Sequence, residues 1–175
     1  RAGSDFLEEG ERAAFGAILA RSAARPTAHG ALLLKAAFES LLGMRKEEIE
    51  ATNKNALKQE SDAYKKAIEG DWLDEREKYY QAMAASEYLA VRSALVDWLI
   101  SWLGDAVRQK AGSAVLSFAQ YAEDTRKLAD SQEMTELLWR IETLEELRSL
   151  LNTNVPENLA LEVCFLKAFG APALA

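Results

Sequence analysis

The residue types that most often carry out chemistry are scarce in this sequence, which contains one histidine, His29, and one cysteine, Cys164. A cysteine nucleophile needs a neighbouring base such as histidine. Cys164 instead lies among core-type residues in the stretch LEVCFLKAF, so we expect it to be a packing residue. A two-metal site in a helical bundle needs glutamates with histidines three residues later, and no acid stands three positions before His29. We therefore predict a surface histidine, no catalytic residue and no metal site.

The carboxylates and glycines do not form a recognisable site either. Acidic pairs such as Glu47–Glu48 and Glu145–Glu146 are typical of a solvated face. The nine glycines form neither a G-x-x-x-x-G-K-[ST] loop nor a G-x-G-x-x-G turn, so phosphates have no predicted cradle. An enzyme that uses surface carboxylates in a cleft is disfavoured, because no set of acid, base and nucleophile can be assembled. We predict a protein that is not an enzyme and has no cofactor and no small-molecule ligand.

The charge and the apolar pattern also exclude several classes of partner. A formal net charge of −7 argues against direct binding of nucleic acid, because such binding depends largely on cationic neutralisation of phosphates. No stretch is apolar and long enough to cross a bilayer or to act as a secretory signal, so we predict no membrane partner and a cytosolic location. The first residue is Arg1 rather than methionine, and we expect the sequence to be part of a longer protein.

The composition favours a folded helical protein. Apolar residues make up 49% of the chain and charged residues 28%, while glycine and proline number only nine and three. A chain of 175 residues suits one core, so we predict a single domain over 1–175. The predicted fold is an all-α bundle of about five to six helices, with one long central helix.

In the first half, the spacing predicts two amphipathic helices and a charged segment. The first, over 4–24, has Ser4 or Asp5 as its cap. Thr27 caps the second, after Pro26, and Gly43 is its expected end. From 45 to 69 large apolar residues are few, and we expect 44–80 to form an exposed charged helix or arm. The stripe expected on the second helix comprises Leu32, Leu33, Ala36, Ala37, Leu41 and Leu42.

In the second half, the longest periodic segment, 72–110, predicts the central helix, which ends near Gly112. Its Trp98 and Trp102 could line a ligand pocket, but two tryptophans four apart on a central helix are more typical of a core. Residues 113–130 predict either a short apolar piece packed under a loop or a broken helix. A further helix is predicted over 131–151, with Ser131 as its cap and Met134, Leu137, Leu138, Ile141, Leu144 and Leu151 turned inward.

The final helix follows the turn LNTNVPEN, in which Asn154 is the expected cap, with Pro156 and Glu157 in the first turn. Its apolar residues occupy two faces: Leu159, Val163 and Leu166 on one, and Leu161, Cys164, Phe165 and Ala168 on another. A helix that is apolar around most of its surface is either buried in its own domain or covered by a partner. We expect the lone carboxylate Glu162 to lie at the edge of the stripe or to pair with a cation, for which Arg148 is the candidate.

Three pieces of sequence together resemble a known family. They are WLISWLGDAVRQKAG at 98–112, the spaced leucines of 137–151, and NTNVPENLALEVCFL at 152–166. In this order they resemble the C-terminal domain of the bacterial clamp-loader subunits of DNA polymerase III, namely delta-prime and the related gamma and tau subunits. The resemblance covers 88–169. The family often has an arginine before the aspartate, where this chain has Gly104, and its counterpart of 44–80 is shorter and less charged.

The resemblance implies a helical collar domain that packs beside homologous domains of other clamp-loader subunits in the bacterial cytoplasm, while separate ATPase modules load the sliding clamp. It places Trp98, Trp102 and Asp105 on the long collar helix. It assigns Asn152, Asn154, Leu159, Ala160, Leu161 and Glu162 to the terminal turn and helix. With Arg148 and Leu166, these residues are the expected interface and structural positions.

The resulting hypothesis is a noncatalytic oligomerisation domain that acts in DNA replication. The alternative is a standalone acidic adaptor that docks a protein partner through 45–80 rather than through the C-terminal helix.

Overall fold

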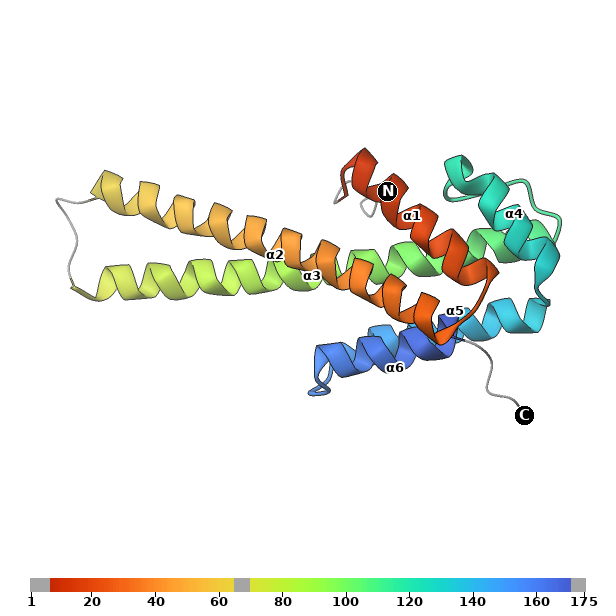
Figure 1. The fold of residues 1–175 in the computed structure, drawn as a ribbon. Coiled ribbons are helices and arrows are strands. Elements are labelled where there is room, and N and C mark those ends of the chain that lie inside the picture. Colours follow the sequence, from red (N-terminus) through yellow and green to blue (C-terminus); the bar gives the residue numbers. More distant parts are fainter. Residues whose placement is uncertain (1–6, 65–69, 171–175) are drawn as a thin grey trace. The chain divides into compact units, whose positions relative to one another are not determined.

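The computed structural model describes residues 7–64 and 70–170, and every regular element in these ranges is helical. This confirms the predicted all-α fold (Figure 1). The proposed caps Ser4 and Asp5 lie outside the described residues. The elements are α1 (Glu9–Ala24), α2 (Ala28–Tyr64), α3 (Gly70–Lys110), the 3-10 turn η1 (Ala119–Tyr121), α4 (Ala122–Ser131), α5 (Met134–Leu150) and α6 (Glu157–Phe169).

The chain divides into two compact units, and the boundary falls within the two longest helices. One unit, which we call the bundle, comprises residues 1–38 and 94–175. The other, the two-helix unit, comprises residues 39–93. The extent of a single domain over 1–175 stays a prediction.

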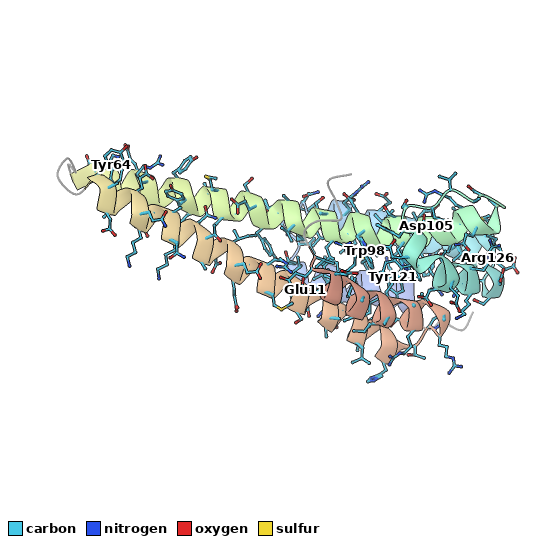
Figure 2. All side chains as sticks on the ribbon, turned by 90° about the horizontal axis from the view of Figure 1, so that it is seen from above. Glu11, Tyr64, Trp98, Asp105, Tyr121 and Arg126 are labelled. Carbon is cyan, nitrogen blue, oxygen red and sulfur yellow. The ribbon has the colours of Figure 1, made fainter. Side chains whose placement is uncertain are left out.

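The bundle is built around an aromatic cluster centred on Trp98. Its ring lies 5.5 Å from that of Phe15, 5.6 Å from that of Phe118 and 5.8 Å from that of Tyr121. Figure 2 shows Trp98 and Tyr121 pointing toward one another. Tilted and edge-on pairs of this kind each contribute about 0.5–1.5 kcal/mol beyond the burial of their area. Trp102 is fully buried nearby on α3, so the prediction that both tryptophans are core residues is confirmed.

The two-helix unit has a thinner contact that relies on polar groups. Residues 39–64 of α2 and 70–93 of α3 run side by side (Figure 1). The Glu60 carboxylate accepts hydrogen bonds from the Arg76 guanidinium at 2.8 Å and from the Tyr80 hydroxyl at 2.9 Å. Asn53 donates to Glu87 at 3.4 Å. The described residues of 44–80 are therefore helical and joined by side-chain ties rather than by a broad apolar core.

Several predicted boundaries are confirmed. The Thr27 hydroxyl accepts the N–H of Gly30 at 2.9 Å and so caps α2 as predicted. Gly112 follows α3 with a φ of 81°, a left-handed conformation that favours glycine. His29 is exposed and Cys164 is buried, as expected. Between 113 and 130 the chain forms a loop, η1 and most of α4, which corresponds to the broken-helix alternative.

Other boundaries were predicted wrongly. Gly43 does not end a helix, because α2 continues through it with a right-handed backbone; in the described residues only Gly112 has a positive φ. Ser131 ends α4, and α5 begins at Met134 after Glu133. Asn154 does not cap α6: the helix begins at Glu157, and the Pro156 carbonyl accepts the N–H of Ala160 at 3.0 Å. The fixed φ of proline sets the entry to this helix without a side-chain cap.

Two predicted apolar stripes were also too broad. On α2 the residues Leu32, Leu33 and Ala36 are exposed, while Ala31, Leu34 and Phe38 are buried at the spacing of one helix face. On α5, Leu138 is exposed rather than turned inward, while Leu137 and Leu144 are buried.

Candidate interaction surfaces

Asp105, on α3, is a fully buried carboxylate that fixes the loop over 113–118. One of its oxygens accepts the backbone N–H of Ser117 at 2.8 Å, and the other accepts that of Phe118 at 2.8 Å. The Arg108 guanidinium pairs with the same carboxylate and donates to the Ser117 hydroxyl at 2.9 Å. A buried carboxylate is costly unless it is paired and hydrogen-bonded, and here it is both. Asp105 thereby holds Phe118 against Trp98.

The predicted pair between Glu162 and Arg148 is wrong. Glu162 lies 3.7 Å from the Lys35 ammonium of α2. Arg148 pairs instead with Asp97 of α3 at 3.0 Å and with Glu145. The correct partner of Glu162 comes from a helix far away in the sequence, so antiparallel succession of neighbouring helices could not identify it. Glu162 does lie at the edge of the apolar stripe, as the first alternative expected, because its side chain is exposed.

Helix α6 has two apolar sides with different environments. One side enters the bundle core and comprises Ala160, Leu161, Cys164, Phe165, Ala168 and Phe169. On the other side, Leu159 is 52% exposed and Val163 is 40% exposed, with Val155 just before the helix and the half-buried Leu166 continuing the row. A spacing of four residues places Leu159 and Val163 on the same strip of the helix surface. We call this row, Val155, Leu159, Val163 and Leu166, the α6 outer row.

The thiol of Cys164 belongs to the inner side. Burial raises its pKa, and the nearby Glu146 acts in the same direction, while Lys167 opposes both. A raised pKa keeps the thiol protonated at neutral pH, and the thiolate is the reactive form. Cys164 therefore packs rather than reacts.

A comparison with protein-family models matches residues 71–168 to the family described as DNA polymerase III, delta subunit, C terminal. This span covers more than half of the chain. The chain belongs to this family. No curated protein and no solved structure matches the chain significantly.

The match to this C-terminal domain of the delta family begins and ends almost at helix boundaries. It starts one residue into α3 and stops one residue before the end of α6, so it contains Asp105, its loop and the α6 outer row. The domain is a clamp-loader-related, noncatalytic part of DNA polymerase III, as predicted. The matched family is that of the delta subunit, and the match does not support the delta-prime, gamma or tau subunits named in the resemblance.

Two further observations concern metal ions and membranes. Within residues 7–64 and 70–170, no group of three or more histidine, cysteine or acidic side chains is placed to hold a metal ion. None of the helices in the described part of the chain has the length and apolar character needed to cross a bilayer.

Sequence reasoning missed the side chains that close the end of α1. The carbonyl of Ala23 accepts hydrogen bonds from Gln132 at 2.7 Å and from the buried Arg140 at 3.1 Å. Arg140 also pairs with Glu136 at 2.8 Å. The only signal in the sequence was an arginine at a position that the helical period of α5 assigns to the inner face.

Proposed function

We propose that this chain is the oligomerisation, or collar, domain of a DNA polymerase III clamp-loader subunit. It holds neighbouring subunits together while the sliding clamp is loaded during DNA replication, and it contributes no catalytic group. Membership of the polymerase III family supports a place in this assembly. The single observation that carries the collar role is the α6 outer row.

Packing within the bundle alone does not require the apolar residues of the α6 outer row. The inner side of α6 already supplies Phe165 and Phe169 to the core. Leu159 and Val163 then expose apolar surface that covering by a partner would remove from water, at about 25 cal/mol per Å². A stable interface needs about 1,000 Å² with an apolar centre. The row supplies such a centre, and Leu138 and Trp139 of α5 add exposed apolar area in the same unit.

The predicted site residues then take two kinds of role. Leu159 and Leu166 contact the neighbouring subunit, and Glu162 lies beside them on the rim with Lys35. Trp98, Trp102 and Leu161 support the surface from the core, and Asp105 fixes the loop that packs on Trp98. Arg148 ties α5 to α3 through Asp97. Asn154 lies in the turn that leads into α6.

The partners are the homologous collar domains of other clamp-loader subunits, in the bacterial cytoplasm. Neither nucleic acid nor membrane is contacted directly. The resemblance assigns the chain to a delta-prime, gamma or tau subunit. Replacing each subunit in turn in a reconstituted loader identifies which position the chain fills.

The test is assembly of the full chain with the other subunits of a bacterial clamp loader, measured by sedimentation velocity. The double variant Leu159→Lys with Val163→Lys places two charges on the outer row, and we expect the association constant to fall about tenfold or more. The matched control is Met83→Lys, because Met83 is 37% exposed, nearly as much as Val163, but lies in the two-helix unit. Unchanged assembly of the double variant would refute the collar role.

The adaptor alternative predicts the reverse pattern, in which changes within 45–80 abolish partner binding and the outer row is neutral. Removing everything after residue 150 is a poor discriminator, because α6 supplies Leu161, Phe165 and Phe169 to the core. Surface substitutions separate the two hypotheses without this loss.

A further inference from the structure

A continuous groove runs along one side of the two-helix unit. It consists of two adjoining hollows of about 400 and 460 Å³ that share Glu50, Gln81 and Ala84. One hollow extends from these residues toward Leu57 and Leu73, and the other toward Ile49 and Leu89. Because the hollows share lining residues from both helices, they adjoin one another along the groove.

The groove has the dimensions and the lining of a seat for a helix. Between Leu73 and Leu89 it follows α3 for about 24 Å at 1.5 Å per residue, the length of a helix of about 16 residues. Ala84 and Ala85 have small side chains, so a partner backbone can approach α3 closely there. Leu73 and Leu89 are 40% and 50% exposed, so each offers apolar surface that an incoming helix would cover.

The two sides of the groove carry different charges. On the α2 side, Lys46 and Lys54 flank Glu50. On the α3 side, Glu77 lines the groove, and the adjoining hollow contains Asp74 and Lys78 beside it, so that one carboxylate remains in excess. Carboxylates on both sides disfavour a nucleic-acid strand, whose phosphates would meet like charge. A helix with one acidic and one basic flank would meet a charge of opposite sign on each side of the groove.

We propose that this groove binds one amphipathic α-helix of a protein partner. Its apolar stripe lies between Leu57, Leu73 and Leu89, its acidic flank faces Lys46 and Lys54, and its basic flank faces Glu77. The bound helix completes a three-helix arrangement, the helix-in-groove mode of peptide recognition. This inference goes beyond the collar role, because it concerns a different surface and a different class of partner.

The experiment uses a displayed library of helical peptides of about 20 residues, long enough to span the groove. The apolar stripe is varied among Ala, Val, Ile and Leu, and the two flanks among Glu, Gln and Lys. Selection is made against the full chain. We expect the enriched peptides to carry acid on one flank and base on the other, and we measure their affinities by fluorescence anisotropy. Absence of enrichment over an unselected pool overturns the proposal.

Two matched variants locate the binding site. Ala84→Phe fills the channel at the point that both hollows share, and we expect it to weaken binding of a selected peptide about tenfold or more. Ala82→Phe makes the same change on the same helix at an exposed position that does not line the groove, and it should leave the affinity unchanged. Equal affinities of both variants for the selected peptides overturn the proposal. Circular dichroism verifies that both variants keep their helices.

Charge exchange tests the orientation of the flanks. The double variant Lys54→Glu with Glu77→Lys should lose affinity for the selected peptides and gain affinity for versions whose two flanks are exchanged. Peptide binding that ignores this exchange contradicts the stated chemistry of the partner. The Leu159→Lys, Val163→Lys variant should still bind the peptides, and Leu89→Lys should still assemble. Failure of the groove proposal is thus separable from failure of the collar proposal.

Discussion

The bundle and the two-helix unit share two helices, yet they are held together by different interactions. In the bundle, α3 places Leu95, Leu99, Trp102 and Leu103 in a closed apolar core, and its polar ties, such as Asp105, are themselves buried. In the two-helix unit, the same helix offers Arg76 and Tyr80 to a part-buried Glu60. The helices also touch there through the rings of Tyr64 and Trp72, whose centroids lie 5.9 Å apart. Several large apolar groups of the unit, including Tyr79 and Leu89, remain exposed.

The difference teaches where each unit obtains its stability and what it leaves for partners. Burial of aromatic and aliphatic groups supplies most of the folding free energy, so the bundle stabilises itself. A pair of helices joined by hydrogen bonds gains less folding free energy, because hydrogen bonds to water are exchanged for hydrogen bonds within the protein. The two-helix unit therefore keeps a groove and exposed apolar residues that a third helix can cover.

The largest expected effect comes from the core of the bundle. Trp102→Ala removes a fully buried indole, and we expect the free energy of unfolding to fall by about 3–5 kcal/mol. Trp139→Ala, at a side chain that is 47% exposed, should cost less than about 1 kcal/mol. Urea unfolding followed by circular dichroism measures both. Similar losses for the two tryptophans would contradict the assignment of the core.

The second effect concerns the buried carboxylate. Asp105→Ala leaves the N–H groups of Ser117 and Phe118 and the Arg108 guanidinium without their acceptor, and we expect a loss of about 3 kcal/mol. Asp97→Ala breaks the exposed pair with Arg148 and should cost at most about 1 kcal/mol. The same urea series compares them. An equal cost for both would show that the loop does not depend on Asp105.

A third expectation compares the two units within one molecule. Amide hydrogens of α3 within 95–106 should exchange only through global unfolding, while those within 74–90 should exchange through smaller openings of lower free energy. Native-state hydrogen exchange with mass spectrometry resolves the two stretches. Identical protection along α3 would mean that the helix opens as one unit and that the division has no energetic meaning.

Sequence reasoning succeeded where a pattern is local and periodic. The helical spacing of Trp98 and Trp102 identified the core, and the side chain of Thr27 and the backbone freedom of Gly112 marked two helix ends. It failed at Gly43, where the cost of one glycine in a helix, about 1 kcal/mol, does not interrupt a long helix. Proline interrupts a helix by steric clash, whereas glycine only permits a helix to end.

The sequence predicted the helix that carries the candidate site, but it did not predict which groups the site residues contact. Two apolar sides on residues 157–169 were evident from the sequence, but which side faces outward depends on how α6 packs in the bundle. The partner of Glu162, Lys35, lies on a helix distant in sequence, and the partners of Asp105 include backbone N–H groups, which no residue type reveals. Lys35 carries no local signal of its tertiary role.

The smallest expected effect lies in the polar tie of the two-helix unit. The hydrogen bond from Arg76 lowers the pKa of Glu60 below its ordinary value, opposed by partial burial and reinforced by Tyr80. A lowered folded-state pKa means that the tie contributes stability above the unfolded-state pKa, and that this contribution is lost as the pH falls through the folded-state value. Carboxyl NMR titration should show Glu60 titrating below its ordinary range, and Arg76→Gln should raise the pKa of Glu60 back toward its ordinary value. Because Glu60 remains partly exposed to solvent, the change in global stability should be small, whereas loss of the tie should increase amide exchange near Tyr80. If Arg76→Gln left both the Glu60 titration and this exchange unchanged, the two helices would be held together by packing alone. The two-helix unit would then not differ from the bundle in relying on polar ties.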